Sequence, residues 1–598
     1  MAGSRRAPLV VAGVVGVLLI AVVRSVTGGD DKPASTTSKG PTKNDSCTVV
    51  HLTASSEKAA LLKQLASDWD GKVKGAGCAR VQVTSKASGG AADALARGWD
   101  EAVDGPRPDV WSPAASSWTQ LLRQKTTAVD KPDLVGSAVP PSIASSPLVI
   151  AMPKPMATAL GWPGKPLGWG DVLKLAQDKR GWASVGQQYG AFTLGKTNPN
   201  FSTSGLHATI GTYVAATGTS SDLTLADLRS KRVQAYAQAV ERAVVHYGDT
   251  TLTFLSNLQQ ADDNGRGLSY ISAVAVEEKS VWDYNQGNPT GDPATLGQHR
   301  KPHTPLVAIY PKEGTLLSDS PYVVLQAPWV QDDVRTAAAA FLSYVRGDKA
   351  QDRFTKAAFR RYDGKPGSVV NEGNGLLPRE PKLVLRPPAP NVLAQVQQLW
   401  AQQRKPAKVL LVIDVSGSMG EPVGADTKLE LAKSAALRAL NQFSPRDDVA
   451  LWAFSTPLDG ARDPYRQLVP FTPVAQGKAL LRKEISALNP EGGTALYATA
   501  RRAYRAMSSG VTSDRISAVV LLTDGRNEYN PDTDLASLER ELSPEDTALS
   551  VRFFPIGYGA DADLPTLRGI AEAARGAAYD ASDPASIDKV FTAVLSNF

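Results

Sequence analysis

Cysteine and histidine are scarce in this chain, with two and five residues among 598. A zinc site needs several such residues at short spacing, and neither Cys47 nor Cys78 has a neighbour of that kind. The histidines follow no readable triad order, and neither a GxSxG nor an HExxH motif occurs. No pair of acidic residues stands out. The sequence gives no support for an enzyme, and we expect a binding protein.

The chain also lacks a strong bias of charge. Its net charge is +6, and the lysines and arginines are spread along the sequence, so no patch typical of nucleic-acid binding is visible. Hydrophobic residues make up 42% of the chain, enough to build sizeable cores, and the length predicts two to four domains. A proline cluster at Leu385–Pro390 marks one boundary, and a short helix is expected to follow at 391–403.

What the chain does contain is a set of oxygen-bearing side chains at the ends of apolar runs. One run begins at Val409 and ends in a DxSxS pattern, and another begins near Ser517 and ends in Thr-Asp-Gly. A Gly-Gly-Thr segment between them opens an alanine-rich helical pattern. Ligands of open parallel sheets bind outside the carboxyl ends of the strands, so these side chains are expected to converge on one ion. Hard oxygen ligands suit Mg²⁺, Mn²⁺ or Ca²⁺. The candidate metal ligands are Asp414, Ser416, Ser418, Thr494 and Asp524.

These three elements, in this order, resemble the von Willebrand factor A domain and its metal-ion-dependent adhesion site. The resemblance covers residues 405–598 and fills all five positions of the site. It implies that Asp414 and Asp524 balance the charge of the ion while the three hydroxyls supply neutral oxygens, some through water. It also implies an open coordination position for an acidic residue of a protein partner. A lone DxSxS is equally typical of a strand followed by a serine turn, but the three elements together favour the metal site.

Strands and helices alternate through the same region, which is typical of a doubly wound, mostly parallel sheet. Strands are expected at 408–413, 448–454, 517–522 and 550–557, with a short edge strand at 467–470. Helices are expected at 428–443, 474–488, 495–507, 564–574 and 587–597.

Residues 46–384 contain a second series of short apolar strands and helices. Five stretches in this order resemble extracytoplasmic solute-binding proteins, the two-lobed clamps that feed ABC transporters. The stretches are Pro108–Pro113, Ser146–Pro153, Trp169–Ala176, Thr197–Gly205 and 337–360. The resemblance implies a small-molecule ligand, but the pocket matches no sugar, oxyanion, metal or peptide signature.

Two kinds of residue are candidates for that ligand site. Serines that open helices lie beside free N–H groups, which suit an anion or another polar ligand, and tryptophans can line a sugar-like pocket. Plain helix capping and core packing are the alternatives, and both stay open. The candidate ligand residues are Ser55, Ser56, Trp111, Ser202 and Ser204.

One motif in this region invites a different interpretation. Residues 190–197 satisfy the phosphate-loop pattern GxxxxGK[ST]. That motif needs a helix that begins at Lys196, but Pro199 restricts Asn198 away from the helical conformation. No strand ending in a magnesium-binding aspartate accompanies it. We therefore predict a strand at 191–195 that runs into a loop, a helix starting near Leu206 that is capped by Ser202–Gly205, and no nucleotide.

The N-terminal residues indicate the compartment. Arg5 and Arg6 precede an uncharged stretch, Ala7–Val23, which is just long enough to span a membrane. The residues after Arg24 offer a poor cleavage site, which favours an uncleaved anchor over a cleaved signal peptide, and the latter remains the alternative. The arginines favour an inside amino end and an exported remainder.

If the chain is exported, residues 27–45 follow the membrane segment, and Cys47 and Cys78 lie in an oxidising compartment. Residues 27–45 are rich in Gly, Ser, Thr, Lys and Asp, which predicts a flexible linker. In an oxidising compartment Cys47 and Cys78 can pair, and two buried thiols are the alternative.

The combined expectation is an α/β protein with a two-lobed clamp and a doubly wound sheet. Its expected parts are a membrane segment (1–26), a linker (27–45), the clamp (46–384), a proline-rich linker with a short helix (385–404) and the metal-binding domain (405–598). We expect a membrane-anchored, extracytoplasmic bacterial protein that recognises a protein partner through a divalent metal, and coupling to ligand capture by the clamp stays open. A transport receptor with an accessory metal domain is the alternative. A chelatase-like subunit is a third hypothesis, but this chain carries no ATPase module.

Overall fold

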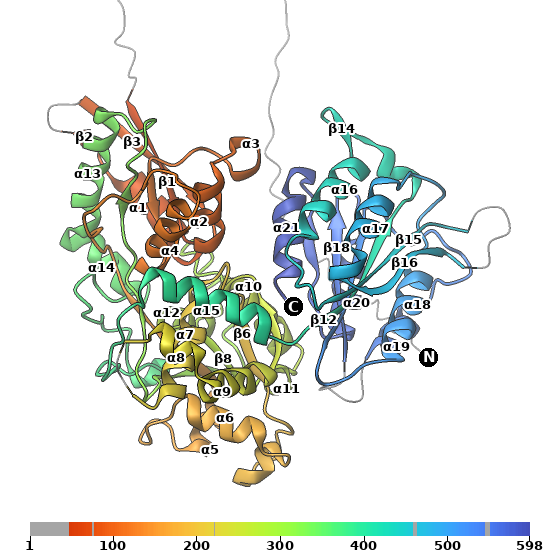
Figure 1. Ribbon diagram of the computed structural model, residues 1–598, viewed down its shortest axis with the longest axis horizontal. Coiled ribbons are helices and arrows are strands. Elements are labelled where there is room, and N and C mark those ends of the chain that lie inside the picture. The colour runs from red at the N-terminus through yellow and green to blue at the C-terminus, as the bar shows by residue number, and fades with distance from the viewer. Residues whose placement is uncertain (1–46, 74–76, 220–221, 458–462, 544–549) are drawn as a thin grey trace, which may run out of the picture. The chain divides into compact units, whose positions relative to one another are not determined.

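The computed structural model of the chain describes residues 47–73, 77–219, 222–457, 463–543 and 550–598. The expected membrane segment and the linker that follows it lie outside these residues. Among the described residues, no helix is both long enough and apolar enough to cross a bilayer. Three main β-sheets organise the described chain (Figure 1).

The first sheet is built around its central strand, β1. The strand order is β11-β4-β1-β3-β2, with β1 parallel to both β3 and β4. The strands are β1 (Thr48–Ala54), β2 (Lys72–Val73), β3 (Gly77–Ser85), β4 (Val110–Ser112) and β11 (Val323–Val324). Val50 and Leu52 of β1 are completely buried in a core that includes Phe341 of the helix α13 (Asp332–Arg346). A buried apolar strand at the centre of a parallel sheet is what the β-branched run at its start predicts.

A disulfide closes one end of this sheet. Cys47 and Cys78 are bonded, so the structure contains the pairing rather than two thiols. Thr48 of β1 is paired in register with Ala79 of β3, which places the two cysteines side by side at the start of both strands. Closing a loop of this length stabilises the fold by about 3 kcal/mol in the chain-entropy account.

The second sheet has the order β10-β5-β8-β6-β7, and β9 also pairs with β5. Its strands are β5 (Ser146–Pro153), β6 (Leu194–Thr197), β7 (Val244–Gly248), β8 (Ala273–Glu277), β9 (Leu306–Ile309) and β10 (Leu317–Ser318). The chain leaves the first sheet after β4 and returns to it at β11. Two crossings between two sheets give the two-lobed α/β architecture that the sequence predicts.

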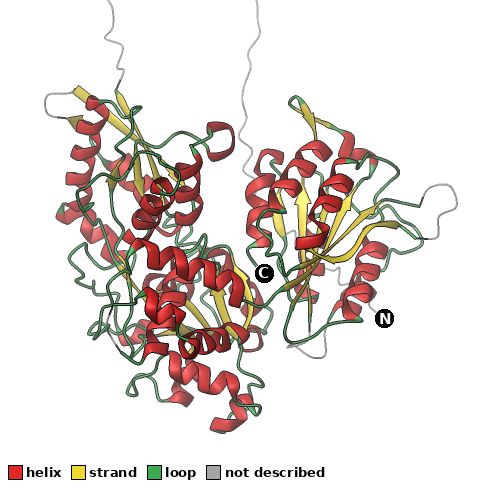
Figure 2. Cartoon of the chain, in the orientation of Figure 1, coloured by secondary structure: helices red, strands yellow, loops and turns green. Residues whose placement is uncertain are grey.

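Helices cover both of these sheets (Figure 2). Those of the first 404 residues with eight or more residues are α1 (Ser56–Asp68), α2 (Ser88–Arg97), α4 (Ser116–Thr127), α6 (Trp169–Gln177), α7 (Thr203–Thr217), α9 (Lys231–Arg242), α10 (Thr251–Asp263), α12 (Glu278–Asn285), α13, α14 (Asp348–Lys356) and α15 (Pro390–Gln403). The short ones are α3 (Glu101–Asp104), α5 (Lys154–Leu160), α8 (Leu225–Arg229) and α11 (Gly267–Tyr270). The short helix predicted after the proline cluster is α15.

The third sheet has the order β16-β15-β12-β17-β18-β19. Its strands are β12 (Ala407–Asp414), β15 (Asp448–Phe454), β16 (Tyr465–Pro473), β17 (Ile516–Thr523), β18 (Val551–Tyr558) and β19 (Tyr579–Ala581). Only β16 is antiparallel to its neighbour. Its helices are α16 (Lys428–Ala439), α17 (Val474–Ser486), α18 (Leu496–Ser508), α19 (Leu535–Leu542), α20 (Leu564–Ala573) and α21 (Ile587–Leu595), and a small hairpin is formed by β13 (Pro422–Val423) and β14 (Asp426–Thr427).

Alternate residues of β12 face two different cores. Val409 and Leu411 pack in one cluster with α16 and α21, whereas Leu410 and Val412 pack in another with α18 and α20. A strand that is buried on both faces is what its continuous apolar run predicts. The predicted doubly wound sheet is therefore confirmed.

Among the elements of the third sheet, two differ from the sequence expectations by more than two residues at one end. Helix α16 ends at Ala439 rather than at residue 443, and the chain turns before Pro445, which disfavours a helical conformation at Ser444. The edge strand β16 is longer than the predicted 467–470 segment and includes two prolines. An edge strand tolerates proline because its outer N–H groups have no partner strand.

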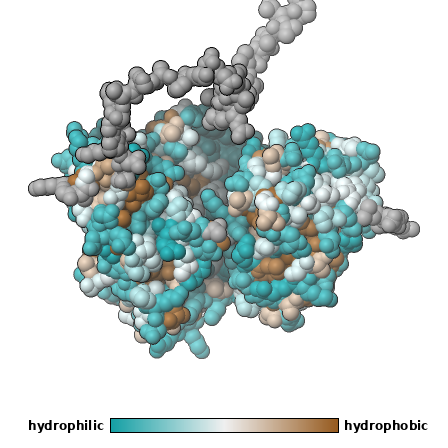
Figure 3. Space-filling view, turned by 90° about the horizontal axis from the view of Figure 1, so that it is seen from above, coloured by the Kyte–Doolittle hydropathy of each residue, from teal (hydrophilic) through white to brown (hydrophobic). Residues whose placement is uncertain are grey.

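The surface is mainly polar. On the face seen in Figure 3, hydrophobic residues are scattered among hydrophilic ones. Val139 is the most exposed of the large hydrophobic side chains described, at 92%.

Candidate metal centre and ligand cleft

The candidate metal ligands lie at the carboxyl ends of central strands of the third sheet. Asp414 is the last residue of β12, and Asp524 directly follows β17. The two strands are parallel neighbours, with Ile413 opposite Leu522. Their carboxyl ends therefore lie side by side, and both aspartates are buried there.

A chain of hydrogen bonds connects four of the five residues. The Oδ1 atom of Asp414 accepts from the backbone N–H of Ser416 at 2.8 Å. The hydroxyls of Ser416 and Ser418 are 3.1 Å apart, and the hydroxyl of Ser418 donates to Oδ1 of Asp524 at 2.7 Å. Ser418 is partly exposed, so the cluster opens to solvent on that side.

Thr494 joins the cluster from a different segment. The backbone N–H of Gly417 donates to the carbonyl of Gly492 at 2.9 Å, which holds the Gly-Gly-Thr segment against the DxSxS loop. A Cβ atom on Gly525 would lie 2.7 Å from the hydroxyl oxygen of Thr494, so only glycine allows this hydroxyl so close to the chain after Asp524. The structure thus brings all five sequence-predicted residues together.

The electrostatics of the cluster suit a cation. Burial raises the pKa of Asp414 to about 7, and the hydrogen bonds from Thr523 and Ser416 offset only part of that effect. No basic side chain pairs with Asp414 among the described residues. Two carboxylates and three hydroxyls form the hard oxygen set that Mg²⁺, Mn²⁺ and Ca²⁺ prefer. The residues present therefore fit a divalent ion.

The cluster is not a carboxylate cage. In the part of the chain that the structure describes, no group of three or more His, Cys, Asp or Glu side chains is arranged to hold a metal. An ion here relies on hydroxyl oxygens for the rest of its shell, and water or a partner's carboxylate must complete it.

Sequence reasoning missed two residues of this cluster. The hydroxyl of Thr523 donates to Oδ2 of Asp414 at 2.5 Å. The ammonium of Lys428 donates to Oδ2 of Asp524 at 2.9 Å and to Oε2 of Glu421 at 2.5 Å. Thr523 belongs to the quoted Thr-Asp-Gly motif and was detectable, whereas a lysine at the start of a helix usually indicates a solvated charge. Here Lys428 is only 6% exposed.

A second site lies between the first and second sheets, where four helices begin. It is a hollow of about 310 Å³, including open solvent. Its lining residues are Ser55, Ser56, Glu57, Ala87, Ser88, Phe201, Ser202, Thr203, Thr250, Thr251, Leu252 and Glu277. They include the first residues of α1, α2, α7 and α10, so the amino ends of four helices, whose first N–H groups have no partner within the helix, surround the hollow.

The two sides of this cleft touch at Gly89. Its backbone N–H donates to the carbonyl of Phe201 at 3.0 Å. A Cβ atom at this position would lie 1.9 Å from the carbonyl oxygen of Asn200, so glycine alone permits the contact. Helix α2 and the segment before α7 are thereby closed against each other.

The candidate ligand residues divide into two groups. Ser55, Ser56 and Ser202 line the cleft. Ser204 lies behind it, fully buried and within 2.7 Å of the Thr251 hydroxyl. Trp111 does not line the cleft, because its side chain is 1% exposed and packs in a hydrophobic core.

The start of α7 also differs from expectation. The helix begins at Thr203 rather than near Leu206, and Ser202 occupies its N-cap position without a side-chain capping bond. The Ser202 hydroxyl instead accepts from the hydroxyl of Thr197 at 2.7 Å. The first N–H groups of α7 therefore receive no side-chain cap and remain at the cleft.

Charged residues that sequence reasoning did not select also reach the cleft. Burial raises the pKa of Glu277 to about 7, with a further contribution from Glu57. Oε2 of Glu277 accepts from the hydroxyl of Thr251 at 3.1 Å. Behind Ser55, burial lowers the pKa of Lys58, whose ammonium donates to the Ser55 hydroxyl and to the carbonyl of Pro113.

The phosphate-loop motif has a different role. Its Lys196 and Thr197 lie in strand β6, which runs from Leu194 to Thr197 rather than over the predicted 191–195, and no helix begins at them. Lys196 is fully buried, and its ammonium pairs with Glu241 and donates to the hydroxyl of Thr209 at 3.1 Å. This lysine points into the protein rather than toward a phosphate.

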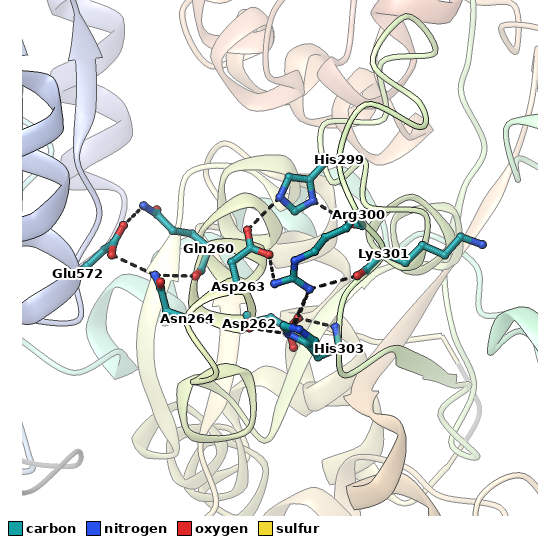
Figure 4. A network of polar contacts seen from close by, with 9 residues as sticks. All are labelled: Gln260, Asp262, Asp263, Asn264, His299, Arg300, Lys301, His303 and Glu572. Atoms are coloured by element: carbon teal, nitrogen blue, oxygen red, sulfur yellow. Dashed lines mark hydrogen bonds and ion pairs between the residues drawn. The ribbon is translucent and has the colours of Figure 1, made fainter. Parts of the chain in front are cut away.

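Two of the five histidines belong to a carboxylate network (Figure 4). Nε2 of His299 lies 3.0 Å from Oδ2 of Asp263, and Nδ1 of His303 lies 3.3 Å from Oδ2 of Asp262. In the contacts drawn there, neither imidazole meets a hydroxyl or thiol nucleophile. The same figure shows Glu572, after the third sheet's β18, accepting from Asn264 at 3.0 Å.

Comparison with known families accounts for most of the described chain. The sequence profile described as bacterial extracellular solute-binding protein matches residues 50–360, which is more than half of the chain. The profile described as von Willebrand factor type A domain matches residues 409–527.

Two similar proteins carry the description uncharacterized. An uncharacterized protein of Mycobacterium tuberculosis is 23% identical over 539 residues, covering 86% of this chain and 70% of that protein. An uncharacterized protein of Synechocystis is 31% identical over 175 residues, covering 29% of this chain. The chain spans only 37% of the length of that Synechocystis protein.

Solved structures resemble each part in turn. The sulfate-binding protein SubI from Mycobacterium tuberculosis is 14% identical, with a TM-score of 0.36, over 56% of this chain and 94% of that one. A von Willebrand factor type A protein from Catenulispora acidiphila is 24% identical, with a TM-score of 0.28, over 32% of this chain and 42% of that one. Likenesses of this extent carry no argument about a ligand.

Proposed function

We propose that this chain is an extracytoplasmic binding protein with two separate recognition sites. It belongs to the bacterial extracellular solute-binding proteins and carries a von Willebrand factor type A domain. The third sheet binds a divalent ion, Mg²⁺ or Mn²⁺ first and Ca²⁺ as an alternative, and uses it to recognise a protein partner. The cleft between the first two sheets captures a small ligand. The chain is not an enzyme in this proposal.

The main support is the uncompensated carboxylate of Asp414. It is fully buried, and no basic side chain pairs with it among the described residues, while three hydroxyls lie around it and Asp524. A buried charge of this kind is costly unless it is paired or coordinates a metal. The partly exposed side of the cluster at Ser418 leaves room for a partner's Asp or Glu to complete the coordination.

The test of this function is partner capture with and without metal. The full-length protein is immobilised, and the proteins that bind to it in the presence of Mn²⁺ are eluted with EDTA and identified. We expect a partner that elutes with EDTA and does not bind the Asp414→Ala variant. A partner that binds equally well in EDTA and to Asp414→Ala would show that the metal is not the recognition element.

The clamp part of the proposal concerns a small ligand with oxygen acceptors. Four helix starts offer N–H groups to the cleft, and Ser55, Ser56 and Ser202 add hydroxyls. Calorimetric titration with sulfate and phosphate as anionic probes, and with glucose as a neutral probe, tests this part. Binding of none of the three would remove the support for an oxygen-rich ligand.

The alternative function is that of a substrate receptor for an ABC transporter with an accessory von Willebrand domain. The solute-binding profile favours it, because it matches the larger part of the chain. A permease gene and an ATPase gene next to this one would support it. A gene neighbourhood without them would favour partner recognition.

Membrane attachment and the domain limits complete the proposal. The uncharged stretch Ala7–Val23 between arginines supports an uncleaved anchor, with the clamp at 46–384 and the metal domain at 405–598. Mass spectrometry of the mature N-terminus tests the anchor. A start between residues 24 and 45 would refute it.

A further inference from the structure

Lys428 places a positive charge against one of the two metal-site carboxylates. It is the first residue of α16, and its ammonium donates to Oδ2 of Asp524 at 2.9 Å. The same ammonium donates to Oε2 of Glu421 at 2.5 Å. The side chain of Asp524 is fully buried, whereas that of Glu421 is 55% exposed. Lys428 thus links a buried carboxylate of the metal centre to an acid at the surface.

The two oxygens of Asp524 are divided between two neighbours. Oδ1 accepts from the hydroxyl of Ser418 and so belongs to the side where Ser416 and Asp414 lie. Oδ2 is held by Lys428. An ion that binds among the five candidate ligands therefore shares Asp524 with an ammonium that is already present.

The surrounding chain fixes Lys428 in this position. Its backbone N–H donates to the carbonyl of Glu421 at 3.0 Å across the small hairpin. The hydroxyl of Thr427 accepts from the N–H of Glu430 at 3.2 Å and caps the helix. A Cβ atom on Gly559 would lie 3.3 Å from Cε of Lys428, so the lysine stem packs closely beneath that glycine.

We propose that Lys428 is a built-in counter-cation that sets the affinity of the metal centre. By neutralising Asp524, it leaves the cluster with one uncompensated carboxylate instead of two. A divalent ion is then attracted less strongly and is also repelled by the ammonium, because both lie next to Asp524. The ion is held weakly until a partner's carboxylate adds the missing negative charge. This inference rests on the proposed function of the metal centre.

The experiment compares two lysines of the same helix. Lys433 is a matched control: it is 8% exposed, and its ammonium donates to Glu430 at 2.8 Å and to the carbonyl of Leu488, away from the metal residues. Mn²⁺ is titrated calorimetrically into full-length protein, Lys428→Met and Lys433→Met. We expect Lys428→Met to bind Mn²⁺ at least about tenfold more tightly and Lys433→Met to differ by less than about twofold. Equal or weaker binding by Lys428→Met would overturn the proposal.

A second pair of variants keeps both lysines and does not depend on Lys428→Met folding. Glu421 and Glu430 are matched, since each pairs with one of these lysines and their side chains are 55% and 54% exposed. Glu421→Gln leaves the ammonium of Lys428 to Asp524 alone, so Mn²⁺ affinity is expected to fall about threefold or more relative to Glu430→Gln. Equal affinities in this pair would also overturn the proposal.

The outcomes separate this inference from the function on which it rests. If neither the natural protein nor any variant binds Mn²⁺, the metal centre itself is refuted, and the counter-cation with it. If the natural protein binds Mn²⁺ and the four variants bind it with the same affinity, the metal centre stands and Lys428 has only a structural role.

Discussion

Lys196 and Glu241 form an ion pair that lies inside the protein, with side chains 0% and 3% exposed. The hydroxyl of Tyr247 also donates to Glu241, and the indole N–H of Trp400 approaches it at 3.3 Å. Burial, with the nearby Glu241 charge, holds the pKa of Tyr247 well above its usual value, so this tyrosine stays a donor. The lysine of the phosphate-loop motif is thus a structural cation.

Replacing that lysine should reduce stability and leave nucleotide binding absent. Lys196→Met leaves Glu241 buried and unpaired, so we expect the free energy of unfolding to fall by about 3–5 kcal/mol. Urea denaturation measures this loss. The double variant Lys196→Met/Glu241→Gln should recover part of it, because no buried charge is then left alone. Micromolar ATP affinity that disappears in Lys196→Met would overturn this interpretation.

Removing Asp414 should abolish divalent-ion binding. The site has only two carboxylates, so Asp414→Ala loses half of its formal negative charge, and calorimetry with Mn²⁺ should detect no binding. Ser416→Ala should weaken binding by about tenfold or less, since a water molecule can replace a neutral oxygen. Circular dichroism should show an intact fold in both variants, because the strand cores are unchanged. Equal losses in the two variants would argue against the assigned roles.

The buried carboxyl of Glu277 should make stability depend on pH. Its folded pKa of about 7 lies above its ordinary value of 4.5. The folded state therefore binds more protons between these values, and stability falls as pH rises from about 4.5 to 7. Glu277→Gln should flatten this slope and be more stable than the natural protein at pH 8 by about 1–3 kcal/mol. Thermal denaturation at pH 5 and pH 8 measures the difference, and the exposed Glu372→Gln serves as control. A steeper slope in Glu277→Gln would contradict the expected direction of the pH dependence.

A side chain at Gly89 should hold the cleft open. A Cβ atom there meets the Asn200 carbonyl at 1.9 Å, whereas the neighbouring Gly90 has nothing within 4 Å. Gly89→Ala is expected to separate α2 from the segment before α7, and Gly90→Ala is its matched control. Small-angle scattering should give a larger radius of gyration for Gly89→Ala only. Identical scattering from the two variants would mean that this contact does not close the cleft.

The residues whose positions could be predicted from the sequence are those whose neighbours in the chain indicate a buried strand or its carboxyl end. Continuous apolar runs predicted β12 and β15 to within one residue, and the carboxyl-end rule placed Asp414 and Asp524 together on sequence grounds alone. The contact between Lys428 and Asp524 was not predictable. A lysine at the start of a helix is usually solvated, and its local sequence does not indicate a buried carboxylate from another segment.

The residues around the cleft also had surroundings that the local sequence did not predict. Thr203 and Ser204 look like a loop in sequence, yet both belong to α7 and are buried. The hydroxyl of Thr203 accepts from the indole N–H of Trp118, and that of Ser204 lies 2.7 Å from the hydroxyl of Thr251, contacts between distant parts of the chain that no local pattern reveals. Trp111 was expected near a ligand because of its residue type, but residue type does not distinguish a pocket wall from a core.

The disulfide between Cys47 and Cys78 has a mechanical consequence. Any pull transmitted along the chain toward Cys47 reaches β1 and β3 at the same moment, because the two strands are bonded at the end where the load arrives. Strand β1 cannot be unzipped from β3 one hydrogen bond at a time from that end. The pair must instead be sheared as a unit from the rest of its sheet, so the described fold begins at a covalently reinforced pair of strands.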